Sequence, residues 1–219
     1  MDSEQDERTP QEARSRRIRQ WIELWSAVLL AAATVATAWS AYQSSLWGGE
    51  QAEHDSAAIT AIVRSGEFNN LALQTTAVHV GLFSQWATAV STQNTALADF
   101  LFARFPEPLK ASATAWLATQ PLTNPSAPMT PFDMPQYVLP TTGEAARWES
   151  SAIDETEAAG KADAISDRYL VFTIIFASVL FFGGISGKFG WQLIDVIVLV
   201  LGALVLFIGL VILFRTPIL

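Results

Sequence analysis

Five side chains near residue 50 and residue 79 have the types and spacing that could hold a divalent metal. Glu50, Glu53 and His54 fall on consecutive turns of one expected helix, with Asp55 beside them, and His79 follows further along. A Glu-x-x-x-His pair places a carboxylate and an imidazole on one helical face, and His79 on the next helix would complete a metal site. Di-iron bundles use Glu-x-x-His pairs on two helices, and this chain has no such pair. A hydrated acidic face explains the cluster more simply, so no metal and no cofactor are predicted.

Two carboxylates lie close to long apolar segments. Carboxylates inside a membrane are candidates for proton or ion handling, and here these are Glu23 and Asp195. Each lies about one helical turn inside the edge marked by Trp21 or Trp191, where it can reach water or a basic side chain. Interfacial ion pairing is therefore favoured over ion transport.

The rest of the chain offers little for catalysis. Cys is absent, which excludes disulfides, thiolate nucleophiles and thiolate metal sites. The GGISGK stretch at 183–188 resembles a phosphate loop only superficially, because Phe182 occupies the first glycine position and Phe189 replaces the required Ser or Thr. With two His and no nucleophile motif, the chain is predicted not to be an enzyme.

Three long stretches of the chain carry no charge and predict its position in a membrane. They cover residues 24–49, 169–187 and 196–214, and a spanning helix needs about 20 mostly apolar residues. Tryptophan and tyrosine mark the edges of these stretches, as in the aromatic belts of membrane proteins. We therefore predict an all-α integral membrane protein with transmembrane helices at residues 21–42, 169–187 and 191–214.

The charges outside these helices predict the topology. Arg14, Arg16, Arg17 and Arg19 precede the first helix, which places residues 1–20 in the cytoplasm by the positive-inside rule. A cleaved signal peptide ending near residues 36–38 is the disfavoured alternative.

Residues 43–168 then form an extracytoplasmic insert with fourteen acidic and six basic residues, which accounts for the net charge of −8. An acidic balance of this kind disfavours nucleic acid as a partner.

The insert is predicted to be a bundle of long helices continuous with the transmembrane helices. The first helix continues upward to a break at Gly66, and an apolar stripe with helical spacing predicts a second helix over residues 67–104. Pro108 is expected near the start of a short third helix. A rival topology makes residues 71–90 a fourth transmembrane helix. That segment has no Asp, Glu, Lys or Arg, but its Gln, His and Thr residues count against it.

A Pro-rich strap completes the insert at residues 121–140, which hold six prolines. Its apolar side chains predict an ordered strap that lies on the bundle, because a free linker would be polar. They are Leu122, Met129, Phe132, Met134, Tyr137 and Leu139. Thr141 and Glu144 have the spacing of a capping box, and a helix from there is expected to run straight into the second transmembrane helix.

Small residues on the transmembrane helices predict close helix packing. Gly183 and Gly187 form one small-xxx-small pair, and Ala32 and Ala36 form another. These faces would either close the three-helix bundle or join protomers of a homo-oligomer.

Four blocks of the sequence resemble a family of uncharacterised bacterial integral membrane proteins. They are TVATAWSAYQSSLWGGEQA, ADFLFARF, AWLATQPLTNPSAPMTPFDMPQYVL and SDRYLVFTIIFASVLFFGGI. The resemblance implies a bacterial plasma (inner) membrane protein with an N-terminal anchor helix, a helical extracytoplasmic insert with a Pro-rich strap and a C-terminal transmembrane hairpin. It implies no activity, so no functional residues are carried over.

The expected function is that of a non-enzymatic interaction or assembly module of the cell envelope. Its expected contacts are the lipid bilayer, an envelope protein partner and further copies of the chain. The alternative is a homo-oligomeric channel or transport component, for which Glu23 and Asp195 would be the functional carboxylates.

Overall fold

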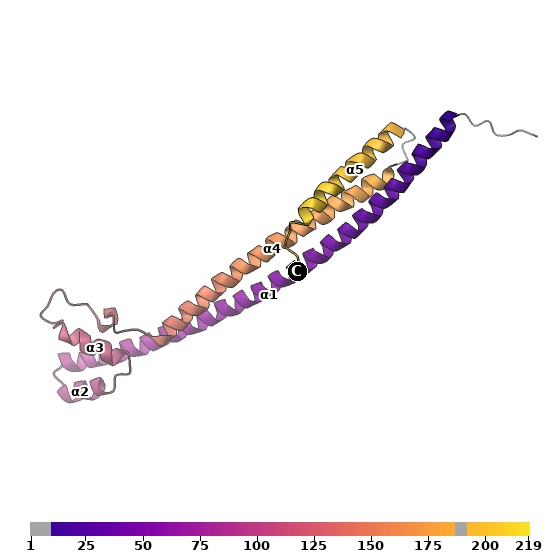
Figure 1. Ribbon diagram of the computed structural model, residues 1–219. Coiled ribbons are helices and arrows are strands. Elements are labelled where there is room, and N and C mark those ends of the chain that lie inside the picture. The colour runs from indigo at the N-terminus through magenta and orange to yellow at the C-terminus, as the bar shows by residue number, and fades with distance from the viewer. Residues whose placement is uncertain (1–9, 187–191) are drawn as a thin grey trace, which may run out of the picture. The chain divides into compact units, whose positions relative to one another are not determined.

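The computed structural model describes residues 10–186 and 192–219, and this part of the chain is helical (Figure 1). Its elements are α1 (Pro10–Ser91), α2 (Thr95–Ala103), α3 (Leu109–Ala118), the 3-10 helix η1 (Pro131–Asp133), α4 (Pro140–Ile185) and α5 (Gln192–Leu213). Three of these helices, α1, α4 and α5, are long and apolar enough to cross a membrane. The prediction of an all-α fold with three long apolar helices that could span a membrane is confirmed.

The chain divides into two compact units. The terminal unit comprises the described residues up to His54 and from Glu157 onward, and the central unit comprises Asp55–Thr156. Both α1 and α4 contribute one part to each unit.

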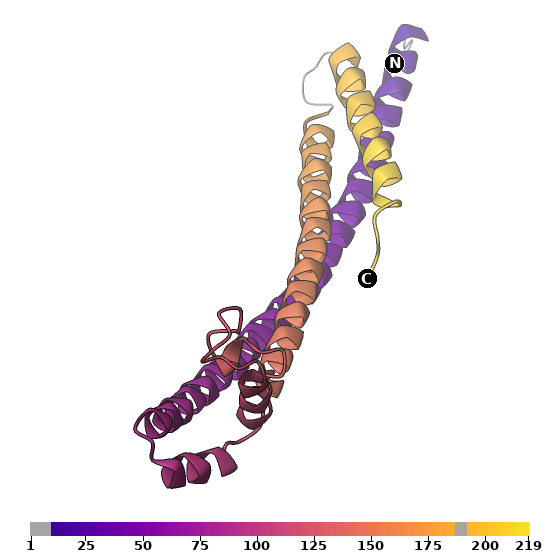
Figure 2. The ribbon, with the colours of Figure 1, turned by 90° about the vertical axis from the view of Figure 1, so that its left-hand side faces the viewer.

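In the terminal unit, α1, α4 and α5 lie side by side (Figures 1 and 2). Leu29 and Ala33 of α1 share one core with Tyr169 and Phe176 of α4 and Leu206 of α5. The buried side chains of α1 alternate in steps of four and three residues, the period of a left-handed helix bundle. They are Ile22, Ser26, Leu29, Ala33, Ala36, Ser40 and Gln43. The small residues among them let the helices approach closely.

The outer faces of these helices are also apolar. On α5, the side chains of Leu193, Val200 and Phe207 are 59–73% exposed. Only 22% of the apolar stretch of α5 is buried within the protein, and the corresponding share is 28% for α1 and α4. In water such surface would cost about 25 cal/mol per Å², whereas hydrocarbon removes that cost. The exposure therefore fits helices surrounded by lipid.

The central unit is built from the end of α1, α2, α3, η1 and the start of α4. Phe105, Leu109 and Ala113 form its buried core, and aromatic side chains of α1 and the strap pack on them. The strap is ordered as predicted, since Trp116 Nε1 donates a hydrogen bond to the Pro128 carbonyl at 2.7 Å. Leu122 and Met129 were expected to pack inward, but each is 90% exposed.

Several predicted helix ends are wrong, and the first concerns Gly66. The helix α1 continues through Gly66 without a break. One helical glycine costs only about 1 kcal/mol relative to alanine, and Ala61, Ser65 and Ala72 are buried along the same side of α1. Packing along the helix therefore offsets the low helix propensity. Since α1 has no turn between residues 42 and 71, the chain has no point there at which to reverse and re-enter a membrane, which argues against the four-span alternative.

The second helix also ends earlier than predicted. Instead of one helix over 67–104, α1 stops at Ser91 and α2 starts at Thr95. The break falls at two polar residues, Gln93 and Asn94. Gln93 adopts a left-handed backbone with φ of 58°, which ends the helix.

The starts of α3 and α4 differ in detail from the predictions. Pro108 caps α3, which begins at Leu109. The predicted capping box at Thr141 does not form, because α4 already begins at Pro140. Within the described part of the chain, the buried Thr141 hydroxyl has no hydrogen-bond partner. Proline suits the first helical position, since it has no N–H group to satisfy there.

Candidate functional site

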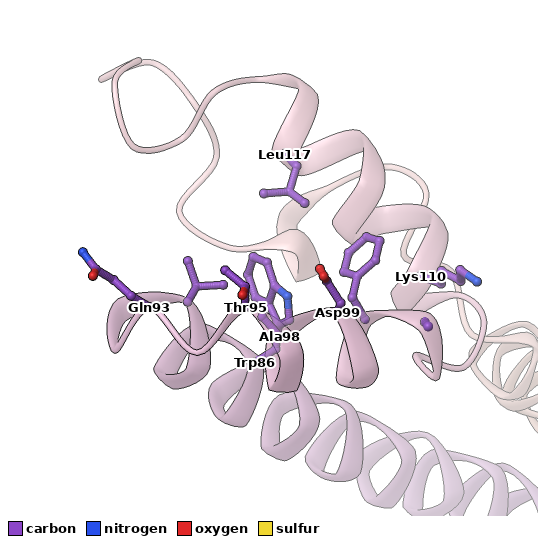
Figure 3. Close-up of a pocket in the computed structure, with 10 residues that line it drawn as sticks. Trp86, Gln93, Thr95, Ala98, Asp99, Lys110 and Leu117 are labelled. Carbon is purple, nitrogen blue, oxygen red and sulfur yellow. The ribbon is translucent and has the colours of Figure 1, made fainter.

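A pocket of about 480 Å³ lies in the central unit, between the end of α1, α2 and α3 (Figure 3). Its lining is mostly aromatic and aliphatic and includes four polar or charged side chains. The lining residues are Trp86, Val90, Gln93, Thr95, Ala98, Asp99, Phe102, Ala103, Lys110 and Leu117. An apolar cavity with a small number of polar groups is the usual form of a ligand or partner site.

The turn between α1 and α2 creates this pocket. Gln93 takes the left-handed conformation, and the Asn94 side-chain oxygen accepts a hydrogen bond from Leu97 N at 3.1 Å, which caps α2. The chain thereby doubles back, and the Phe102 ring lies 6.0 Å from the Trp86 ring. A non-glycine residue at positive φ costs free energy that the surrounding structure must offset.

A continuous aromatic cluster adjoins the pocket through Trp86, one of the lining residues. Phe83 stacks on Trp86 at 5.6 Å between ring centroids and meets Trp116 and Phe132 edge-on at 5.5 and 5.8 Å. The Phe132 ring in turn meets Tyr137 edge-on at 4.9 Å. Each such pair contributes about 0.5–1.5 kcal/mol beyond the area that it buries. The cluster therefore fixes α3 and the strap against α1.

Asp99 and Lys110 supply the charges of the pocket. Figure 3 shows the Asp99 side chain in the space between α2 and α3, and the Lys110 ammonium directed away from it. A group with an apolar body and a polar or charged end would match this mixed lining. The arrangement is thus chemically suited to binding.

His79 lies buried beside this cluster and bonds to the strap. Its side chain is 3% exposed, and its Nδ1 shares a hydrogen bond with the Tyr137 hydroxyl at 2.9 Å. Burial lowers the pKa of His79 below its ordinary value of 6.5, because a charged imidazolium would lose its hydration. His79 is therefore a neutral part of the strap contact.

This burial predicts that the strap contact weakens in mild acid. In the unfolded chain His79 takes up a proton near pH 6.5, and in the folded chain it does so only at lower pH. The stability that neutral His79 contributes is complete above pH 6.5 and is lost as the pH falls toward the folded pKa. We expect the melting temperature of the central unit, followed by tryptophan fluorescence, to fall between pH 7.5 and 5.5.

The matched control is His79→Gln, which does not titrate, and its pH dependence over this window should be smaller. All other titratable side chains, His54 included, are the same in the two proteins. If the melting temperature changed equally with pH in the wild type and in His79→Gln, the role given to His79 would be contradicted.

The candidate metal ligands of the sequence are not brought together. Glu50 Oε1 and His54 Nε2 are 3.6 Å apart on one face of α1, whereas Glu53 is exposed. His79 lies on α1 itself, 25 residues beyond His54, so its expected place on a following helix is wrong. Across residues 10–186 and 192–219, no group of three or more His, Cys, Asp or Glu side chains has metal-binding geometry. The hydrated-face interpretation fits this arrangement better.

The two carboxylates near the membrane segments have different surroundings. Glu23 is exposed on α1, and Asp195 is 6% exposed in the first turn of α5. The Ser186 hydroxyl donates a hydrogen bond to the Asp195 carbonyl at 3.3 Å. A carboxylate in the first turn of a helix is stabilised by the positive end of the helix dipole, which gives Asp195 a structural explanation. Trp191, which was expected to mark the edge of this helix, lies outside the described residues.

Of the predicted packing residues, Gly183 and Ala36 lie at helix contacts within the protein. A Cβ atom on Gly183 would come within 3.1 Å of Leu30. Ala36 is 5% exposed and belongs to the row of buried side chains on α1. Ala32 faces outward instead, and Gly187 lies outside the described residues.

Sequence reasoning missed two further packing glycines, Gly202 and Gly209 of α5. Cβ atoms there would approach Leu29 at 3.2 Å and Phe176 at 2.6 Å. Their seven-residue separation was the available signal.

A buried polar layer ties the last residues of the chain to α1 and α4. The Gln43 side chain, fully buried, donates to the Leu219 carbonyl at 3.2 Å and accepts from Leu219 N at 3.1 Å. Tyr169 and Trp47 both donate to the Pro217 carbonyl, at 2.9 and 3.3 Å. An unpaired amide here would cost about 1–3 kcal/mol, so this layer specifies the position of the segment.

Comparison of the chain with protein-family models, with curated proteins and with solved structures gave no match. The candidate site therefore rests on its own geometry.

Proposed function

We propose that this chain is a non-enzymatic interaction or assembly module of a bacterial inner membrane, with its central unit on the outer face. The main support for the proposal is the open pocket of the central unit, whose lining includes the contacting rings of Trp86 and Phe102. Its occupant would be an apolar side chain of an envelope protein partner, with neighbouring polar groups of that partner near Asp99 and Lys110. The family resemblance of the sequence supports the cellular location.

The topology in this proposal places residues 1–20 in the cytoplasm and residues 43–168 outside. It is supported by the arginines that precede the first apolar stretch and by the unbroken course of α1. The acidic charge of the insert is compatible with a translocated domain, since long domains cross the membrane largely regardless of charge.

A photo-crosslinking experiment in intact cells tests the binding role of the pocket. A photoreactive phenylalanine at Thr95, which lines the pocket, should give a defined protein adduct. The same probe at Thr114, exposed on α3 outside the pocket, should not. The yield of the Thr95 adduct should fall at least fivefold when the substitution Val90→Trp fills the cavity. With Leu97→Trp the yield should stay unchanged. Val90 and Leu97 are 42% and 43% exposed, so they form a matched pair.

Adducts that are equal at the two probe positions, or unchanged by Val90→Trp, would refute the binding role. Ion flux through liposomes that disappears with Asp195→Asn or Glu23→Gln would instead support the homo-oligomeric channel or transport component.

A further inference from the structure

The terminal unit has an apolar groove between α1 and α5 on its outward side. Two adjoining cavities form it, of about 710 and 380 Å³, and they share Val28, Ala32 and Leu210. Along α1 the groove extends from Trp25 to Trp39, a rise of about 21 Å. Its α1 side is lined in part by the small side chains of Ala31, Ala32 and Ala36, and Ala32 is exposed.

The dimensions of the groove indicate what can fill it. The larger cavity, of about 710 Å³, is lined along α1 from Val28 to Trp39, eleven residues or about 16 Å of helix axis. A helix with side chains is about 10–12 Å wide, so a transmembrane helix would rest across the groove. A single extended hydrocarbon chain is thin enough to lie along it.

A basic residue follows the lining of the groove directly in the sequence at one end. Phe214 and Ile218 line that end together with Trp39, and Arg215, exposed, directly follows Phe214. No ion pair joins Arg215 to another described residue. Tryptophan is typical of the membrane interface, and an arginine at that depth can bind phosphate through two parallel hydrogen bonds.

We propose that this groove binds one acyl chain of a glycerophospholipid whose phosphate pairs with Arg215. The chain packs along Ala32 and Ala203, and its charged end lies at the level of Trp39. In an empty groove the lining side chains would lack dispersion contacts on one side. An acyl chain in the groove supplies these contacts and so stabilises the packing of α1 against α5. This lipid site is independent of the pocket in the central unit.

Native mass spectrometry of the full-length protein in detergent tests the site, with phosphatidylglycerol carrying palmitoyl and oleoyl chains as the probe. We expect one tightly held phospholipid per chain. Ala32→Leu should weaken its binding at least tenfold by filling the groove. Ala177→Leu makes the same change at an exposed position of α4 outside the groove and should leave binding unchanged. Ala203→Leu fills the groove from α5 and replaces Ala32→Leu if that variant does not fold.

Arg215→Gln separates the contribution of the phosphate from that of the acyl chain. This substitution should weaken the binding of phosphatidylglycerol but not the binding of a diacylglycerol with the same acyl chains. Equal lipid retention by Ala32→Leu, Ala203→Leu and Ala177→Leu would overturn the proposal. So would a dimer that Ala32→Leu converts to a monomer, because the occupant would then be a second copy of the chain.

Discussion

Gly209→Leu is expected to destabilise the terminal unit by about 3 kcal/mol or more. A Cβ atom at position 209 would lie 2.6 Å from the Phe176 ring, and Phe176 is fully buried. The ring cannot move away, because it stacks on Phe172 and belongs to the shared core of the three helices. Overpacking a filled core costs about 1–3 kcal/mol, occasionally more, and separation of α5 would add the loss of its contacts.

The measurement is the thermal unfolding of the purified protein in detergent. Gly184→Leu is the matched control, since Gly184 is a helical glycine on α4 with open space around its Cβ position. Both substitutions gain helix propensity, so the difference between them isolates the clash with Phe176. Equal melting temperatures for the two variants would show that α5 does not pack as described.

Phe83→Ala is the second substitution with a large expected effect, and it acts on the central unit. The Phe83 ring of α1 contacts Trp86 on the same helix, Trp116 of α3 and Phe132 of the strap. Its side chain therefore joins α1 to both α3 and the strap. Truncation of a buried aromatic residue costs about 3–5 kcal/mol. Phe83 is half-buried, so we expect about 3 kcal/mol.

Limited proteolysis of the strap reports this effect. Cleavage within residues 121–139 should accelerate by at least tenfold in Phe83→Ala. In the control Phe100→Ala it should stay near the wild-type rate, since Phe100 is 52% exposed and its ring meets the Arg104 guanidinium at 3.8 Å. A strap that remains protected in Phe83→Ala would mean that the aromatic cluster does not hold it.

The long apolar helices were predictable because their signal comes from many residues at once. A stretch such as 196–214 remains apolar whatever its exact ends are, and hydrocarbon thickness alone fixes the length that a spanning helix needs. The strap was predictable only in part. Six prolines exclude a long helix or a strand there, but η1 forms within the strap, and two of its apolar residues, Leu122 and Met129, remain exposed.

Single-residue signals were less reliable. Gly66 predicted a break that the packing of α1 overrides, whereas the true end of α1 at Ser91 depends on Gln93 adopting a positive φ. Glutamine has no special preference for that conformation, so propensity alone could not locate the turn. The pocket was missed for the same reason, because Trp86 and Phe102 meet only after the chain has doubled back.

The metal hypothesis shows how an error in one element alters a site. His79 was expected opposite His54 only because a break was placed at Gly66 between them. With α1 unbroken, the two imidazoles belong to different parts of one helix, and His79 bonds to Tyr137 of the strap instead.

The central claim is that helices at both ends of the chain are embedded in a membrane, with the central unit outside the cytoplasm. Because the chain contains no cysteine, single cysteines at Ser126 in the strap and at Ser186 after α4 can be labelled in whole cells with a membrane-impermeant maleimide. We expect Ser126→Cys to react at once and Ser186→Cys to react only after the membrane is permeabilised. Immediate labelling at position 186 with protection at position 126 would contradict the topology.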